Sequence, residues 1–159
     1  MSRKMILQSI LLTITAGGQM LAAWLLYNPD ANSTIINLGW GVIMLSAIFG
    51  WLPIFTFRSR GKVDGKSYTE TTVLVDSGIY SIVRHPQYLA GILINSGLSL
   101  ITTHWIVILL GIISWGIYIQ NTFSEEDNCV EKFGDSYCAY QARVPRLNFA
   151  LGLIRLLSR

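Results

Sequence analysis

Three long stretches without a charged side chain constrain this chain more than any other feature of its sequence. They cover residues 6–27, 35–57 and 87–123 and contain 22, 23 and 37 residues. A helix needs about 20 apolar residues to cross the hydrocarbon core of a bilayer. Each of the first two stretches therefore predicts one membrane-spanning helix, and the third is almost long enough for two.

The composition also favours a membrane protein. Of the 159 residues, 52% are hydrophobic and 13% are charged, whereas a soluble domain usually contains about 25% charged residues. The length is that of a single domain. The first apolar stretch is too long for the core of a cleaved signal peptide, so we expect it to remain as the first helix.

The third stretch is predicted to turn at residues 102–104, which divides it into two arms. The predicted spans are then residues 6–27, 35–57, 86–101 and 105–123. The third of these is short for a full span, and a re-entrant hairpin is the alternative. Small residues that would allow close packing between membrane helices occur at Gly17, Gly18, Gly91, Ser96, Gly97 and Ser99.

Shorter helices are predicted after the last span. Ser124 is suited to cap a helix over residues 125–133 that ends at Gly134. Residues 147–157 are mostly apolar but too short to span, so they fit a helix lying in the membrane interface. The sequence thus predicts an all-α integral membrane bundle, a single domain over residues 1–159 with about four spans and short C-terminal helices.

The basic residues predict how this bundle is oriented. With four spans, one side receives both termini and the polar loop 58–86, and the other side receives residues 28–34 and 102–104. All 12 Lys and Arg residues fall on the first side: 3, 4, 58, 60, 62, 66, 84, 132, 143, 146, 155 and 159. Positive residues mark the cytoplasmic side, so we expect the termini and residues 124–146 to be cytoplasmic.

Two polar stretches on that side contain the candidate functional residues. Arg84 and His85 precede a predicted helix that begins at Pro86, where the missing N–H of proline costs nothing. The acidic cluster of Glu125, Glu126 and Asp127 is costly beside lipid unless it is solvated or paired. Arg84, Arg143 and Arg146 are the available partners. Interfacial ion pairs without a catalytic role would account for the same pattern.

Several classes of site are not indicated. The sequence contains neither a Walker loop nor a GxGxxG motif, and no Ser or Cys has a base at a spacing typical of covalent catalysis. Cys129 and Cys138 are expected to be reduced cytoplasmic thiols. His85 and His104 fall on opposite sides, so no metal site is predicted. Tyr137 and Tyr140 share a helix face and could form the wall of a ligand site.

The two polar stretches together resemble a known family, the isoprenylcysteine carboxyl methyltransferases and their prokaryotic relatives. The resemblance rests on the pattern Arg84-His85-Pro86-x-Tyr88-x-x-Gly91, on Glu125-Glu126, and on Phe133-Gly134-x-x-Tyr137-x-x-Tyr140-x-x-Arg143-Val144-Pro145-Arg146. The lead-in from Leu74 to Tyr80 is also similar. Cys129, Ile79 and Asn148-Phe149 depart from the usual pattern, at positions outside the expected chemistry.

The resemblance implies a methyltransferase that uses S-adenosylmethionine as methyl donor. It implies that the cofactor is bound by Arg84, His85, Tyr88, Glu126, Tyr137 and Tyr140. It further implies that Glu126 and Arg143 act near the reacting carboxylate of an isoprenylcysteine-like acceptor from the bilayer. The expected partners are thus a lipidated substrate and membrane lipids, with no nucleic acid.

Three other functions fit parts of the sequence. A phospholipid or small-lipid methyltransferase would use the same cofactor on an amine acceptor, for which Arg143 is less suited. An NADPH-dependent membrane reductase of the sterol type has a similar first motif. A four-helix scaffold without enzymatic activity is the third, although charge clusters next to lipid are poorly explained by it.

Overall fold

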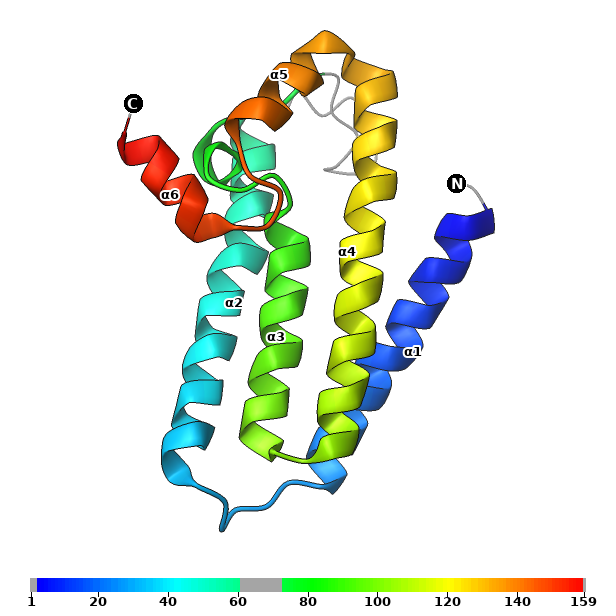
Figure 1. Cartoon of the computed structure of the whole chain (residues 1–159), viewed down its shortest axis with the longest axis vertical. Coiled ribbons are helices and arrows are strands. Elements are labelled where there is room, and N and C mark those ends of the chain that lie inside the picture. Colours follow the sequence, from blue (N-terminus) through cyan, green and yellow to red (C-terminus); the bar gives the residue numbers. More distant parts are fainter. Residues whose placement is uncertain (1–2, 61–72, 159) are drawn as a thin grey trace. The chain divides into compact units, whose positions relative to one another are not determined.

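The computed structural model describes residues 3–60 and 73–158, and the regular elements in this part are helical (Figure 1). In chain order they are α1 (Arg3–Leu25), α2 (Ser33–Arg60), the 3₁₀ turn η1 (Gly78–Ser81), α3 (Pro86–Thr102), α4 (Trp105–Phe133), α5 (Asp135–Arg143) and α6 (Phe149–Leu157). The predicted all-α fold is confirmed. Residues 61–72 of the predicted polar loop lie outside the described residues, and the beginning of that loop, up to Arg60, is helical instead.

Three of the described helices are long and apolar enough to cross a membrane, over Ile6–Leu25, Ser33–Ser59 and Trp105–Phe133. The chain is therefore a membrane protein. Helix α3 has 17 residues and at 1.5 Å per residue is about 25 Å long, somewhat less than the roughly 30 Å of a hydrocarbon core. The fourth span remains a prediction.

Local backbone chemistry explains where several of these helices begin and end, and one predicted helix start is absent. Pro86 begins α3, Thr103 turns the chain between α3 and α4 with φ of 51°, and Gly134 ends α4 with φ of 55°. The predicted helix start at Ser124 is wrong, because α4 continues without a break from Trp105 to Phe133. Residues 124–133 are thus the polar end of α4, beyond its apolar part.

The chain divides into two compact units. Unit 1 contains Met1–Ala47 and Ala90–Asn121, and unit 2 contains Ile48–Leu89 and Thr122–Arg159. In unit 1 a close helix approach joins Gly39 of α2 to Gly97 of α3, where a β-carbon on either residue would lie 2.9 Å from the other's carbonyl oxygen. The contact predicted at Gly17 and Gly18 is wrong, because a β-carbon there would have no neighbour within 4 Å.

Unit 1 also holds a buried amide. The side chain of Gln19 is fully buried, and its Nε2 donates to the carbonyl oxygens of Asn95 and Val107 at 2.9 and 3.1 Å. A lone polar group among apolar helices is costly unless it is hydrogen-bonded. These bonds therefore tie α1 to α3 and α4.

In unit 2, η1 and α6 support the segment that leads into α3. Tyr80 of η1 packs edge-on against Phe57 of α2, with ring centroids 4.9 Å apart. Asn148 caps α6 by accepting a hydrogen bond from the backbone of Leu151 at 3.0 Å. Gly152 brings α6 so close to the backbone of Ile82 that a β-carbon would overlap it. The predicted C-terminal helix is confirmed, and its place at the interface remains a prediction.

Candidate functional site

The candidate site begins where two distant segments of unit 2 pair through their backbones. The N–H of Arg84 donates to the carbonyl of Pro145 at 3.0 Å, and that of His85 donates to the carbonyl of Arg146 at 3.2 Å. The carbonyl of His85 in turn accepts from Leu89 at 3.0 Å and opens α3. The two motifs found in the sequence are therefore adjacent in the fold.

The carboxylate of Glu126 lies at the junction of these segments and is 4% exposed. Its Oε1 accepts from Arg84 Nε and Nη2 at 2.9 and 2.8 Å and from His85 Nε2 at 3.0 Å. Arg146 donates to both oxygens, with its Nη2 2.6 Å from Oε2, and the amide of Gln141 donates to Oε2 at 3.2 Å. One carboxylate thus joins the start of α3, the polar end of α4 and the segment around α5.

These donors determine the charge of Glu126. Burial alone raises the pKa of this carboxyl, but the hydrogen bonds from His85 and Arg146 and the charge of Arg84 outweigh burial and lower the pKa to about 2. An ionised carboxylate has no proton to donate. The Nε2 of His85 must therefore carry the proton in their hydrogen bond, which leaves Nδ1 on the side of Glu125, 3.9 Å from its Oε2.

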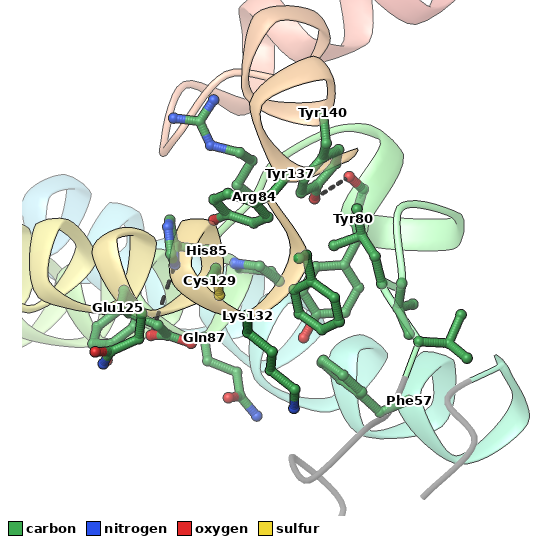
Figure 2. Close-up of a pocket in the computed structure, with 17 residues that line it drawn as sticks. Phe57, Tyr80, Arg84, His85, Gln87, Glu125, Cys129, Lys132, Tyr137 and Tyr140 are labelled. Carbon is green, nitrogen blue, oxygen red and sulfur yellow. Dashed lines mark hydrogen bonds and ion pairs between the residues drawn. The ribbon is translucent and has the colours of Figure 1, made fainter. Parts of the chain in front are cut away.

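A cavity of about 200 Å³ borders this network, since Arg84 and His85 belong to both; Figure 2 shows the residues that line it. One water needs only about 10–15 Å³ of such space, so the cavity has room for part of an organic ligand. Its wall has a carboxylate at Glu125, cations at Arg84 and Lys132, and the aromatic rings Phe57, Tyr88 and Phe133. Leu74, Val75, Gln87, Asn128 and Cys129 also line it.

Two buried tyrosines of α5 complete the wall. The rings of Tyr137 and Tyr140 meet edge to face, with centroids 5.7 Å apart. The hydroxyl of Tyr140 donates to the carbonyl of Tyr80 at 2.7 Å, as Figure 2 shows. Burial raises the pKa of both phenols. Both therefore stay protonated at neutral pH and act as aromatic surfaces and hydrogen-bond donors.

Cys129 also lies on the wall, but it is not an activated nucleophile. Burial, together with the negative charge of Glu125, raises the pKa of its thiol to about 11. With this pKa the thiol of Cys129 is almost entirely protonated at pH 7. Because the thiolate is the reactive form of cysteine, Cys129 is unreactive in this state.

The structure brings most of the residues predicted for the site together. Arg84, His85, Tyr88, Tyr137 and Tyr140 line the cavity, and Glu126 lies behind it, held by its donors. Arg143 does not reach Glu126 and is not among the residues that line the cavity; it forms an exposed ion pair with Asp76, with 3.1 Å between Nη2 and Oδ2.

Sequence reasoning missed several members of the site. The sequence predicts Arg146 only as a possible partner of the acidic cluster, with no further role. In the structure its guanidinium also stacks on Phe123, 3.7 Å from the ring centroid. Gln141 and Lys132 had no signal in the sequence beyond their polarity. Their helical spacing from Tyr137 and Cys129 could have placed them near the site.

The fold and site together define a class: an all-α membrane protein with a polar, aromatic-walled cavity backed by a buried carboxylate. Residues 34–136, more than half of the chain, match the family model described as phospholipid methyltransferase, and the chain belongs to that family. No solved structure matches the chain.

Curated relatives narrow the comparison. The protein-S-isoprenylcysteine O-methyltransferase of Schizosaccharomyces pombe is 31% identical over 124 residues, which cover 71% of this chain and 52% of the relative. That of Dictyostelium discoideum is 36% identical over 73 residues, 45% of this chain and 31% of the relative. Protein-S-isoprenylcysteine O-methyltransferase B of Arabidopsis thaliana is 28% identical over 120 residues, 70% of this chain and 57% of the relative.

These names confirm the resemblance drawn from the motifs. The chain nevertheless spans about half the length, or less, of most of the curated relatives that it matches.

Proposed function

We propose that this protein transfers a methyl group from S-adenosylmethionine to the carboxylate of an isoprenylcysteine-like acceptor in the membrane. The observation that carries the proposal is the junction of both sequence motifs on Glu126, directly behind a polar cavity. The family and the names of the relatives support methyl transfer. A methyltransferase needs a methyl donor, and the residues that line the cavity suit S-adenosylmethionine.

The residues of the cavity fit the groups that S-adenosylmethionine carries. Its α-ammonium group needs an anion, which Glu125 offers, and its carboxylate needs cations, which Arg84 and Lys132 offer. Its adenine needs a flat apolar surface, which tyrosine and phenylalanine rings provide. We therefore propose that Arg84, His85, Tyr88, Tyr137 and Tyr140 hold the cofactor.

When bound, the sulfonium would supply a methyl group to a carboxylate oxygen by in-line displacement, in which the C–O bond forms as the C–S bond breaks and S-adenosylhomocysteine leaves as a neutral thioether. The task of the protein is to hold donor and acceptor at attack distance and to exclude water. We propose that Glu126 contributes to this positioning without lining the cavity itself, because it fixes the ring of His85 and the guanidinium of Arg84. Arg143 is proposed to bind the acceptor's carboxylate, since guanidinium and carboxylate match in shape and charge.

A cytoplasmic position of this site would suit the two substrates. The donor is polar and dissolved in the cytosol, whereas a lipidated acceptor resides in the bilayer. The polar end of α4 follows directly on the apolar part of that helix, so both substrates could reach a site there. The positive-inside rule favours a cytoplasmic position for that end.

A second candidate function follows from the description of the family model, which names phospholipids. An amine acceptor in a lipid headgroup would use the same donor. Methyl incorporation into an S-prenylcysteine analogue and into membrane lipids, measured with the same purified protein, separates the two acceptors. Preferred labelling of lipids would reject the carboxylate acceptor.

Cofactor binding is the first test of the proposal. Calorimetry on the purified protein in detergent should detect S-adenosylmethionine and not NADPH. His85→Ala should lose most of this affinity, whereas the matched change His104→Ala, at a histidine outside the cavity, should retain it. A thermal unfolding curve for each variant separates lost binding from lost folding. Binding of NADPH alone would instead support a reductase.

Turnover tests the role of Arg143. Arg143→Ala should abolish methyl transfer to the prenylcysteine analogue while S-adenosylmethionine still binds. Normal turnover in this variant would remove Arg143 from the proposed mechanism.

A further inference from the structure

The three arginines of the two motifs differ in their anionic partners. Arg84 and Arg146 both bind the buried carboxylate of Glu126. Arg143 binds Asp76, and both side chains of this pair are about half exposed, at 50% and 43%. Of these three guanidinium groups, Arg143 is therefore the one bound to a solvent-exposed carboxylate.

The pair lies at the border of the cavity. Asp76 directly follows Val73, Leu74 and Val75, which line the cavity, and Arg143 lies one helical turn after Tyr140, which lines it too. The pair thus joins the segment before η1 to the last turn of α5.

The contacts of Arg143 are few and weak. Its Nη2 reaches one carboxylate oxygen, and its Nε donates to the carbonyl of Ala139 at 3.3 Å. This is a single contact between Arg143 and Asp76 and not the two parallel hydrogen bonds of a strong arginine–carboxylate pair. Exposed pairs of this kind are worth little and are screened by salt. A second carboxylate that offers both oxygens would compete with Asp76 for the guanidinium.

We propose that Asp76 is the resting counter-ion of Arg143 and that the carboxylate of the acceptor displaces it. This inference rests on the proposed function, because it assumes that Arg143 receives the acceptor. Asp76 then sets the affinity for anionic acceptors: it keeps the guanidinium solvated and oriented beside the cavity, and each acceptor must break the ion pair in order to bind. Asp76 is thus a residue that determines specificity without contacting the cofactor.

A purely structural role for the pair makes the opposite prediction. If the ion pair only held residues 73–75 in place, its loss would make this part of the cavity wall less ordered and weaken the binding of every ligand. If Asp76 competes with the acceptor, its loss strengthens the binding of an acceptor that has a carboxylate and leaves cofactor binding unchanged.

Asp76→Asn tests the proposal by calorimetry in detergent, with S-adenosylmethionine present. The ligands are an S-prenylcysteine analogue with a free carboxylate and the same compound as its carboxamide. We expect about two- to fivefold tighter binding of the carboxylate, the scale of an exposed ion pair, and unchanged binding of the carboxamide and the cofactor. Asp76→Glu should restore wild-type affinity. Asp127→Asn removes the same charge at an exposed position outside the cavity and should change nothing.

The outcomes separate this inference from the proposed function. Unchanged or weaker carboxylate binding in Asp76→Asn, or an equal gain for the carboxamide, would overturn it. If wild-type protein transferred no methyl group but Asp76→Asn still bound the carboxylate more tightly, the proposed reaction would fail and the role of Asp76 would stand. Normal methyl transfer without the change in affinity would overturn the role of Asp76 and leave the proposed reaction in place.

Discussion

At the scale of single residues, Glu126 is the group on which the site depends. Its two oxygens accept from Arg84, His85, Gln141 and Arg146. A carboxylate has about four lone-pair directions, so these donors leave little capacity for a ligand. Glu126 therefore acts through its neighbours, and its removal would leave the guanidinium groups of Arg84 and Arg146 without their anionic partner.

Glu126→Ala should strongly destabilise the protein. Breaking a buried ion pair by removing one partner typically costs about 3–5 kcal/mol, and here Arg84 and Arg146 lose their shared anion while His85 loses the acceptor of its Nε2 hydrogen bond. The measurement is thermal unfolding in detergent at pH 7, with Glu131→Ala, at an exposed glutamate of the same helix, as the control. A Glu126 variant as stable as the control would contradict the importance of the network.

The stability of the wild type should also depend on pH in a defined range. The folded protein holds the pKa of Glu126 at about 2, below its ordinary value of 4.5. A carboxyl with a lowered pKa stabilises the fold fully above its unfolded value, and this contribution is lost as the pH falls towards the folded value. The melting temperature should therefore decrease from about pH 4.5 towards pH 2. In Glu126→Ala this decrease should be smaller.

The sequence could predict which residues gather at the site, but not all of their partners. Arg84, His85, Tyr137 and Tyr140 were found because their spacing forms a motif. Arg143 and Arg146 are three positions apart, and both were candidates for the acidic cluster. Arg143 is the last residue of α5, whereas Val144 leaves the helix with an extended backbone. This change of direction brings Arg146 to Glu126, and a sequence pattern does not contain it.

At the scale of elements, the ends of helices were predictable where the cause is local. Pro86 and Gly134 act through their own backbone chemistry, and both predictions are confirmed. The predicted cap at Ser124 is wrong because a serine caps a helix only where the preceding chain is not helical, and here α4 continues through it. The predicted contact at Gly17 and Gly18 is wrong because a close contact depends on which face of α1 meets another helix.

The docking of α6 leads to a prediction at this scale. A β-carbon on Gly152 would overlap the backbone of Ile82, and backbone atoms move less easily than a side-chain end. Ile82 lies two residues before Arg84, so α6 supports the segment that enters the site. Gly152→Ala should cost about 1–3 kcal/mol, as is usual for overpacking, and should weaken cofactor binding.

Thermal unfolding and calorimetry in detergent measure both effects of Gly152→Ala. Gly116→Ala is the matched control, because a β-carbon there meets no atom within 4 Å. In a helix this change is expected to be neutral or slightly stabilising. If both variants had the same stability and cofactor affinity, the close contact between α6 and Ile82 would contribute to neither.

At the scale of the whole molecule, the orientation in the membrane decides whether the proposed chemistry is possible. The proposed donor, S-adenosylmethionine, is cytosolic, so the proposed reaction requires a cavity that opens to the cytoplasm. The placement of all 12 Lys and Arg residues on one predicted side argues for this orientation through the positive-inside rule. A native cysteine allows this orientation to be tested by thiol labelling, because Cys138 is exposed on α5 and lies between Tyr137 and Tyr140 in the sequence.

A membrane-impermeant maleimide should therefore label Cys138 in inside-out vesicles and leave it unlabelled in right-side-out vesicles. The experiment uses Cys129→Ser, which removes the other thiol, and detergent-solubilised protein gives the full extent of labelling. Labelling in right-side-out vesicles would place α5 on the outer face. In that case neither the cofactor site nor the exchange of Asp76 for an acceptor could operate with a cytosolic methyl donor, however well the geometry of the cavity suits it.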